Sequence, residues 1–398
     1  MTALNISNQT ARWLWLHSQG LSAAPTGQCD AATAGSIITE LGLLQQDPIR
    51  VVARAHDHIL WSRRTQYRPN HLDTLMHKHR GVFEHFSHDA CLLPIQILPY
   101  WQRQFGRKAK QYEQPGWREG LLNSSDQREL IDKIVNDGPL ASKDFKHHEF
   151  ATPASGEIWS KPAHKRTLDY LWLKGELAVS HRKNFIKYYD IATRIYPAHF
   201  LSEVISDSEQ IDWLCSNALS RLGMASPGEI MRFWEACSLA ETKHWCDANA
   251  DQLISLRVES SIGEYTDALC FAKNETLLYT PPEPTRRLRI LNPFDPALRD
   301  RNRLERLFGF EYRIEMYTPP DKRQYGYYVY PLLEFDQIIG RIEVKHDRQR
   351  NELLVDNLWL EAGVKLGKGR LRALESELER MRKFCGADCF LLNSKFVG

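Results

Sequence analysis

The stretch Lys165–Asp190, KRTLDYLWLKGELAVSHRKNFIKYYD, carries the clearest structural signal in the chain. Its first half has apolar residues at helical spacing, which predicts a helix over residues 165–176. Its second half alternates apolar and polar residues around the basic segment HRKN (181–184), which predicts two strands joined by a turn. A helix followed by such a hairpin is typical of a winged helix, whose helix enters a DNA groove while its hairpin carries cations to the phosphates.

Four cations of this stretch are candidate DNA contacts: Lys165, Arg166, Arg182 and Lys183. The net charge of the whole chain is only +2, but its distribution is uneven, because residues 203–283 hold five basic and fourteen acidic residues. Residues 161–194 hold eight basic and three acidic residues. This asymmetry indicates a phosphate-binding face beside an acidic outer wall, although a solvated globular surface also shows it by chance.

Further helical units are predicted before and after residues 165–190. Residues 6–21, 33–44 and 48–64 read as three helices with short turns, and residues 71–110 as further helix with breaks at Pro94 and Pro99. Residues 211–256 read as a third helical unit, in which the segment SPGE (226–229) predicts the start of a helix. Beyond residue 283 the pattern changes to short alternating strands over 286–294, 310–320, 324–335, 338–348 and 351–361, followed by an amphipathic helix over 369–387. These strands predict a small β-barrel or sandwich that the last helix closes.

Composition excludes other classes of protein. With 398 residues, 42% hydrophobic and 26% charged, the chain suits a globular protein of two to four modules. Its first apolar run, WLWL at 13–16, is too short for a signal peptide or a membrane span, so we expect a cytoplasmic protein without membrane association. The eight cysteines are scattered and form no CxxC pair, which argues against a disulfide framework or a zinc cluster.

The segment LLQQDPIRVV (43–52) allows two interpretations. Asp47 followed by Pro48 is a good start for a helix, because Asp is a favoured N-cap and Pro is favoured at the first helical position. Local chemistry alone favours this structural interpretation. Alternatively the segment is extended, in which case Gln45 and Asp47 face one side and Gln46 the other.

Four segments together carry a resemblance to a known family: LGLLQQDPIRVVARAHDHILWSRR (41–64), HRGVFEHFSHDACLLP (79–94), the unit ending in YYDIATRIYP (188–197), and LNPFDPALRDRNRLERLFGFEYRIEMYTPPDKRQYGYYVYPLL (291–333). In this order, over nearly the whole chain, they resemble the AlkZ/YcaQ-like family of bacterial DNA glycosylases, and most closely its YcaQ branch. The resemblance implies an α+β fold with three tandem winged helix-turn-helix units and a C-terminal β-barrel. We place these at 1–125, 126–200, 201–285 and 286–398.

The resemblance also implies a function: hydrolysis of the N-glycosidic bond of N7-alkylated purines, including the unhooking of DNA interstrand crosslinks, in base excision repair. The family's catalytic signature is Gln, a usually apolar residue, then Gln or Asp. It falls here on Gln45, Gln46 and Asp47, so the polar Gln46 departs from the family's pattern. We expect Asp47 to stabilise an oxocarbenium-like sugar and act as a base, and Gln45 to orient water. The expected partner is double-stranded DNA carrying alkylated or crosslinked purines.

Other side chains are less specific. Lys322 and Arg323 lie in PPDKRQYG (319–326), which reads as a hairpin tip that could probe a DNA groove or be an ordinary charged turn. His56 and His58 flank Asp57 in the sequence. Adjacent residues of a helix do not face each other, which favours a structural role for the two histidines. The histidines at 77, 79, 85 and 88 have no matching carboxylates, so we expect no metal and no cofactor.

We also expect a monomer. The alternative function is a winged-helix regulator or architectural protein without catalysis.

Overall fold

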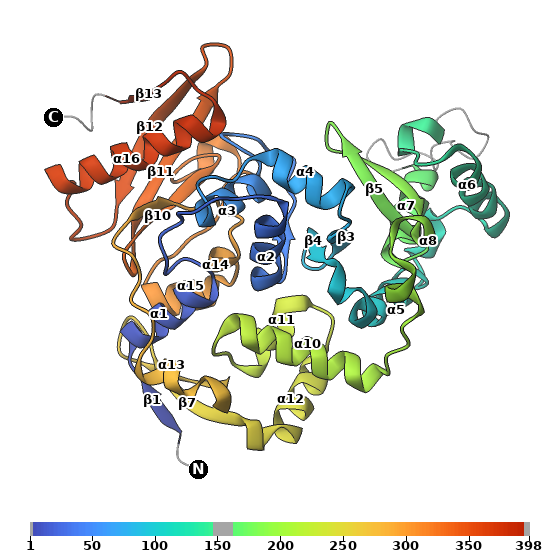
Figure 1. Ribbon diagram of the computed structural model, residues 1–398, viewed down its shortest axis with the longest axis horizontal. Helices are drawn as coiled ribbons and strands as arrows, with labels where there is room; N and C mark the ends of the chain where they lie inside the picture. The colour runs from blue at the N-terminus through green and yellow to red at the C-terminus, as the bar shows by residue number, and fades with distance from the viewer. Residues whose placement is uncertain (1–2, 146–161, 394–398) are drawn as a thin grey trace.

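The computed structural model describes residues 3–145 and 162–393. Helices and short hairpins make up most of the chain, and the largest sheet and a long helix lie at the C-terminal end (Figure 1). The helical part curves from the N-terminal helices beside the C-terminal sheet, through the hairpin β5–β6, to α10 and α12 at the opposite side (Figure 1). The mixed α and β content agrees with the predicted class.

The first helical stretch contains a three-stranded sheet in the order β2-β4-β3. Its elements are β1 (Leu4–Ile6), α1 (Asn8–Ser18), α2 (Ala31–Leu41), β2 (Leu44–Gln45), α3 (Ala55–Arg63), α4 (Pro69–His77), β3 (Val82–Phe86) and β4 (Ala90–Pro94). The helix predicted over 71–110, with breaks at Pro94 and Pro99, is therefore wrong for 82–94, where a hairpin forms. Arg80 has a positive φ of 48° directly before it, which is incompatible with a continuing helix.

The predicted start of the third helix is also wrong. This helix, α3, begins at Ala55 and not at Pro48. Residues 49–52 are held instead against the C-terminal sheet, because the backbone N–H of His346 donates to the carbonyl of Val51. The guanidinium of Arg348 donates to the carbonyls of Arg50 and Val52 as well. Because residues at the end of a distant strand hold these carbonyls, the segment is not helical, and the chain bends at residues 51–53.

The second stretch contains the predicted helix and hairpin. Its elements are α5 (Gln102–Tyr112), α6 (Ser124–Asp137), α7 (Ala163–Leu173), β5 (Leu177–Lys183) and β6 (Ile186–Ile191). Strands β5 and β6 pair antiparallel, and the two turn residues Asn184 and Phe185 both have positive φ. Such a two-residue turn matches the twist of the flanking strands. The helix and the hairpin predicted for Lys165–Asp190 are confirmed, with the helix ending at Leu173.

The third stretch also contains an antiparallel hairpin, to which β1 adds a parallel strand. Its elements are α8 (Ala192–Ile195), α9 (Ala198–Ser202), α10 (Asp207–Leu222), α11 (Pro227–Trp234), α12 (Leu239–Ala248), β7 (Leu253–Glu259), β8 (Tyr265–Phe271) and α13 (Glu275–Tyr279). Helix α11 starts as predicted, because Ser226 and Glu229 form a capping box with Pro227 at the first helical position.

The C-terminal part is a five-stranded sheet in the order β13-β12-β11-β10-β9, packed against α16. Its elements are β9 (Leu288–Ile290), α14 (Pro296–Arg299), α15 (Arg301–Phe308), β10 (Val329–Glu334), β11 (Gln337–Asp347), β12 (Glu352–Leu360), α16 (Lys368–Cys385) and β13 (Cys389–Leu392). The sheet is a half-barrel and not the closed barrel expected from the resemblance. The strand predicted over 310–320 is absent, and β13 was not predicted.

The helical stretches share their cores with the C-terminal sheet and with one another. One core joins Ile38, Leu44 and Trp61 to sheet and α16 residues such as Ile342 and Leu378. A second core joins the β3–β4 hairpin to α10, α11 and β7. Because each core contains residues from distant parts of the sequence, the position of one stretch depends on the others.

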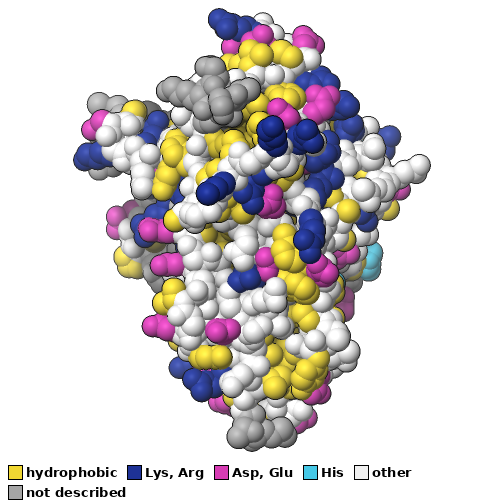
Figure 2. Space-filling model, turned by 90° about the vertical axis from the view of Figure 1, so that its left-hand side faces the viewer, with side chains coloured by type: hydrophobic (Ala, Val, Ile, Leu, Met, Phe, Trp, Pro, Cys, Tyr) yellow, Lys and Arg dark blue, Asp and Glu magenta, His cyan; other side chains and the backbone are white. Residues whose placement is uncertain are grey.

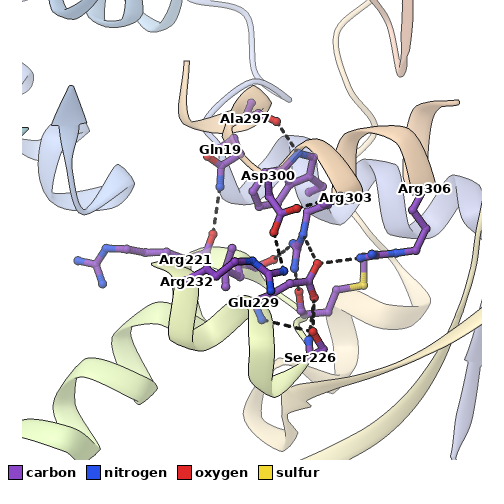
Figure 3. A network of polar contacts seen from close by, with 12 residues as sticks. Gln19, Arg221, Ser226, Glu229, Arg232, Ala297, Asp300, Arg303 and Arg306 are labelled. Atoms are coloured by element: carbon purple, nitrogen blue, oxygen red, sulfur yellow. Dashed lines mark hydrogen bonds and ion pairs between the residues drawn. The ribbon is translucent and has the colours of Figure 1, made fainter. Parts of the chain in front are cut away.

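Buried ion pairs add to these connections. Glu229 of α11 accepts hydrogen bonds from Arg303 (3.0 Å) and Arg306 (2.8 Å) of α15, as Figure 3 shows. Arg303 attracts the Glu229 carboxylate strongly enough that, although burial opposes it, the pKa of Glu229 lies well below its ordinary value. Arg63 of α3 forms a second pair with Asp295, at 2.5 and 2.9 Å.

The outer face of the C-terminal part carries many cations among carboxylates. Figure 2 shows Lys and Arg side chains over the upper half of the face seen from the left of Figure 1. On α16, however, Arg370 pairs with Glu334 and Arg382 pairs with Glu379. These pairs reduce the net charge that α16 presents to a polyanion.

Candidate active site

The predicted catalytic residues lie at the end of β2, opposite the turn that joins β3 to β4. Gln45 is paired with Cys91, and the backbone N–H of Gln46 donates to the carbonyl of Ala90 at 2.8 Å. This register brings the QQD segment beside His88 and Asp89 of the turn. Each of the three residues of the segment is at most 7% exposed. The site is therefore set by pairing between two hairpin strands and a short third strand.

Asp47 is not a helix cap. Its Oδ1 accepts a hydrogen bond from the backbone N–H of Ile49 at 2.8 Å, which closes a local turn, while α3 begins eight residues later. Burial raises the pKa of Asp47, the Ile49 N–H opposes this rise, and the charge of Asp89 adds to it. The helix-cap interpretation is therefore wrong, and Asp47 is a buried carboxyl group next to a second one.

Gln45 contacts the turn that joins β3 to β4. Its Nε2 donates to Asp89 Oδ2 at 3.1 Å, and its Oε1 lies 3.2 Å from His88 Nε2. Asp89 therefore contacts Gln45 directly and acts on Asp47 through its charge. That Gln45 and Asp47 share one side of an extended segment stays a prediction. The structure places an amide and a buried carboxyl group two residues apart in this segment.

Gln46 differs from its neighbours. It is 5% exposed, and its side-chain oxygen Oε1 is buried and has no hydrogen-bond partner among the described residues. A buried polar atom without a partner costs on the order of 1–3 kcal/mol. The polar residue at this position is thus not explained by a contact within the described part of the protein.

We predict that Gln46→Leu raises the free energy of unfolding by on the order of 1 kcal/mol, because it removes this unpaired amide at similar volume. Base release should stay at the wild-type rate. Urea denaturation and a single-turnover assay measure the two quantities. A large loss of rate in a stably folded Gln46→Leu protein would place Gln46 in the chemistry and contradict this prediction.

Tyr328 and Asn292 lie near this site. The Tyr328 side chain is buried and its hydroxyl is 3.3 Å from Asn292 Nδ2. Burial raises the pKa of Tyr328, the hydrogen bond to Asn292 opposes this, and the charge of Asp47 adds to the rise. A cavity of about 310 Å³ lies between α1, α11 and residues 296–302, and Leu43 and Arg299 are among the residues that line it. None of Gln45, Asp47 and His88 lines it, but Leu43 lies two residues before Gln45 and the charge of Arg299 acts on His88, so the cavity borders the QQD segment.

The four predicted cations of the second stretch are in different environments. Lys165 and Lys183 are exposed and Arg166 is half-buried. Arg182 instead donates to both carboxylate oxygens of Glu84 in β3, at 2.8 and 2.5 Å. Its guanidinium also lies over the Phe185 ring. Arg182 therefore connects the β5–β6 hairpin to β3 of the first stretch. The basic run HRKN (181–184) predicted a contact with DNA and did not indicate this ion pair.

Lys322 and Arg323 do not lie at a hairpin tip. They belong to a loop that Glu315 closes, because its carboxylate accepts hydrogen bonds from the backbone N–H groups of Gln324, Tyr325 and Gly326. Lys322 is exposed, and Arg323 is half-buried over the Tyr327 ring. Tyr317 on the same loop is 85% exposed. The predicted hairpin tip is therefore wrong, and a contact of Lys322 or Arg323 with DNA stays a prediction.

The other histidines have structural environments. His58 is fully buried and its Nε2 lies 2.9 Å from the carbonyl of Ile290. His56 is buried and stacks on Phe185 of the hairpin turn. Within residues 3–145 and 162–393, three or more His, Cys, Asp or Glu side chains are nowhere grouped as metal ligands.

None of the helices described is long and apolar enough to span a membrane.

The sequence prediction missed Asp89 and considered His88 only as a metal ligand. The positions of Asp89 and His88 beside Gln45 depend on the β3–β4 hairpin, a segment that was predicted to be helical. The β-branched and aromatic residues Val82, Phe83 and Phe86, followed by the SHD segment (87–89), were the signals that could have indicated a strand and a turn here.

The fold and the chain's sequence define a class of protein, the DNA glycosylases. A family model described as DNA glycosylase AlkZ-like matches residues 38–384, so the chain belongs to the AlkZ-like family. Its structure is similar to that of Streptomyces sahachiroi DNA glycosylase AlkZ, with a TM-score of 0.68 and 15% sequence identity. The similarity covers 98% of this chain and 100% of that one. At this identity the match concerns the fold, and family membership supports a glycosylase enzyme.

Proposed function

We propose that this protein is a monofunctional DNA glycosylase that hydrolyses the N-glycosidic bond of N7-alkylated purines and unhooks DNA interstrand crosslinks in base excision repair. The observation that carries the proposal is the buried Asp47 carboxyl group two residues from Gln45, whose amide contacts Asp89, while the charge of Asp89 acts on Asp47. An amide and a buried carboxylate are the groups that water attack on a sugar carbon requires.

The chemistry needs little beyond these groups. An N7-alkylguanine carries a positive charge, so its base departs as a neutral molecule without a general acid. As the bond between C1′ and the base nitrogen breaks, its electron pair moves to the base, and C1′ becomes an oxocarbenium-like cation. Water then bonds to C1′ and transfers a proton to the carboxylate. The products are the free alkylated base and an abasic site, and no metal ion or cofactor takes part.

Asp47 would supply two effects. Its negative charge stabilises the developing sugar cation at low dielectric, and its oxygen accepts the proton of the attacking water. The Ile49 N–H holds one carboxylate oxygen, Oδ1, in place. Gln45 would accept a hydrogen bond from the water without removing its proton, since an amide is not a base at neutral pH. Orientation and proton transfer are thus divided between the two side chains.

The three helical stretches would act as winged helix-turn-helix units on double-stranded DNA. In each, a helix is followed by a hairpin: α4 by β3–β4, α7 by β5–β6 and α12 by β7–β8. This is the element order of a winged helix. On the second unit, Lys183 and Lys165 are exposed and can reach phosphate, whereas Arg182 is committed to Glu84. The loop that carries Lys322 would contact DNA near the site, since Tyr328 follows it.

We predict that Lys183→Glu weakens affinity for DNA of any sequence and lowers the slope of log K against log salt by about 0.9 for each phosphate that the variant no longer neutralises. Lys322→Glu tests the loop in the same titration. The matched control is Lys345→Glu, since Lys345 is an exposed cation already paired with Asp356. Fluorescence anisotropy over a range of salt concentrations measures the slope. An unchanged slope for Lys183→Glu would remove the hairpin from the DNA surface.

The proposed function is tested by incubating the full chain with DNA that contains N7-methylguanine. Released base is measured by mass spectrometry, and strand cleavage is measured before and after alkali. We expect free N7-methylguanine and strand breaks that appear only after alkali. A non-catalytic regulator would release no base, and a lyase would cleave the strand without alkali.

A further inference from the structure

The hydrogen bonds of Gln45 determine which way its amide points. Asp89 is a carboxylate and can only accept, so the group facing its Oδ2 at 3.1 Å is the Nε2 of Gln45. The other end of the same amide, Oε1, therefore faces His88. The amide orientation follows from its partners and does not depend on distinguishing nitrogen from oxygen.

The same argument assigns the tautomer of His88. Gln45 Oε1 can only accept, so His88 Nε2, 3.2 Å away, must carry the hydrogen that it donates. The other ring nitrogen, Nδ1, is buried and has no hydrogen-bond partner among the described residues, as suits an unprotonated nitrogen. Burial lowers the pKa of His88 to about 3, and the nearby charge of Arg299 contributes. The imidazole is thus neutral at physiological pH and donates from one nitrogen only.

We infer that His88 is a positioning residue for the hydrolysis, which holds the Gln45 amide so that its oxygen faces the attacking water. With one lone pair of Oε1 taken by His88, the second remains to accept a hydrogen from water. If Asp47 accepts the other hydrogen of that water, the oxygen lone pair is left free to attack C1′. Asp89 anchors the opposite end of the amide. This inference rests on the proposed function and adds a residue that acts through Gln45 without touching the substrate.

A rotated amide would have the opposite effect. If Gln45 presented Nε2–H to the water, it would donate to the lone pair that must attack C1′, and so hold the water in an unproductive orientation. A donor at the position of His88 Nε2 prevents this rotation. Misplacement of a reacting group typically costs about tenfold to a hundredfold in rate.

The test compares variants of His88 under single-turnover conditions with N7-methylguanine DNA. His88→Phe keeps the ring volume but removes the donor, and we expect base release to slow about tenfold or more with unchanged DNA affinity. His88→Gln places an amide N–H where Nε2 lies and should restore most of the rate. His88→Asn places its amide where Nδ1 lies, cannot reach Gln45, and should not restore it.

A double-mutant cycle separates positioning from a general structural role. In a Gln45→Ala background, His88→Phe should cause little further loss, because the amide that it holds is absent. His85→Phe is the matched control: His85 is a buried histidine that contacts Trp101 and the carbonyl of Leu173, and its effect should be the same in both backgrounds.

The outcomes distinguish the inference from the proposed function. If the wild-type protein releases no base, both fail. If the wild-type protein is active and His88→Phe is equally fast, or slows the Gln45→Ala protein by the same factor as the wild type, only the role of His88 fails. If His88→Phe does not fold, the comparison of His88→Gln with His88→Asn decides, and equal rates for these two variants would overturn the inference.

Discussion

Asp47→Asn is expected to slow release of N7-methylguanine about a hundredfold under single-turnover conditions, on the order of 3 kcal/mol. The substitution keeps the shape of the side chain and the oxygen that accepts from the Ile49 N–H, so the local turn should survive. It removes the negative charge that stabilises the sugar cation and the group that accepts the water proton. DNA affinity and thermal stability should therefore stay close to those of the wild type.

The control for this variant is Asp356→Asn, since Asp356 is a partly exposed carboxylate on β12, paired with Lys345. Its rate should equal that of the wild type. Gln45→Ala should cost less than Asp47→Asn, because water can be held in part by other groups. The double variant should show less than the sum of the two losses if both side chains act on one water molecule. Additive losses would mean that the two residues act separately.

Asp295→Ala is expected to lower the free energy of unfolding by about 3 to 5 kcal/mol, the usual effect of breaking a buried ion pair. Asp295 is fully buried, and it forms two hydrogen bonds with the equally buried Arg63 of α3. It also accepts from the backbone N–H of Ala297 at the start of α14. Its loss leaves the guanidinium of Arg63 buried without its carboxylate partner.

Urea denaturation measures this effect, and Asp356→Ala provides the comparison. The Asp356–Lys345 pair is partly exposed, so its loss should cost at most about 1 kcal/mol. Asp295 joins the first stretch to the segment after β9, so Asp295→Ala should also make the QQD segment more accessible to hydrogen exchange. A loss no larger than that of Asp356→Ala would show that the buried pair does not hold these parts together.

Local patterns predicted the elements whose geometry depends on nearby residues. The hairpin around Asn184 follows from alternation and a turn, and the start of α11 follows from Ser226, Pro227 and Glu229. Such features need no distant partner. The AlkZ-like family membership, which the comparisons establish over residues 38–384, was likewise recognisable from the order of four segments.

The errors concern segments whose structure depends on distant contacts. Residues 49–52 were predicted to be helical after Asp47–Pro48 but are held in a non-helical, bent conformation by His346 and Arg348 at the end of β11. The segment 310–320 looked like a strand, but Glu315 uses its carboxylate to close a loop. The contact of Gln45 with Asp89 depends on the register of β2 with β4, which a single sequence does not specify.

The most direct test of the central claim, that the Asp47 carboxylate performs the chemistry, is the pH dependence of single-turnover N7-methylguanine release by the wild type and Asp47→Asn. Burial raises the pKa of Asp47 above its ordinary value of 3.8, so its carboxylate takes up a proton at a higher pH than a solvated Asp does. The wild-type rate should therefore be constant near neutral pH and fall on acidification through this raised pKa. The Asp47→Asn rate should be low and show no such fall. Equal rates for the two proteins, or the same acid limb in both, would contradict the account.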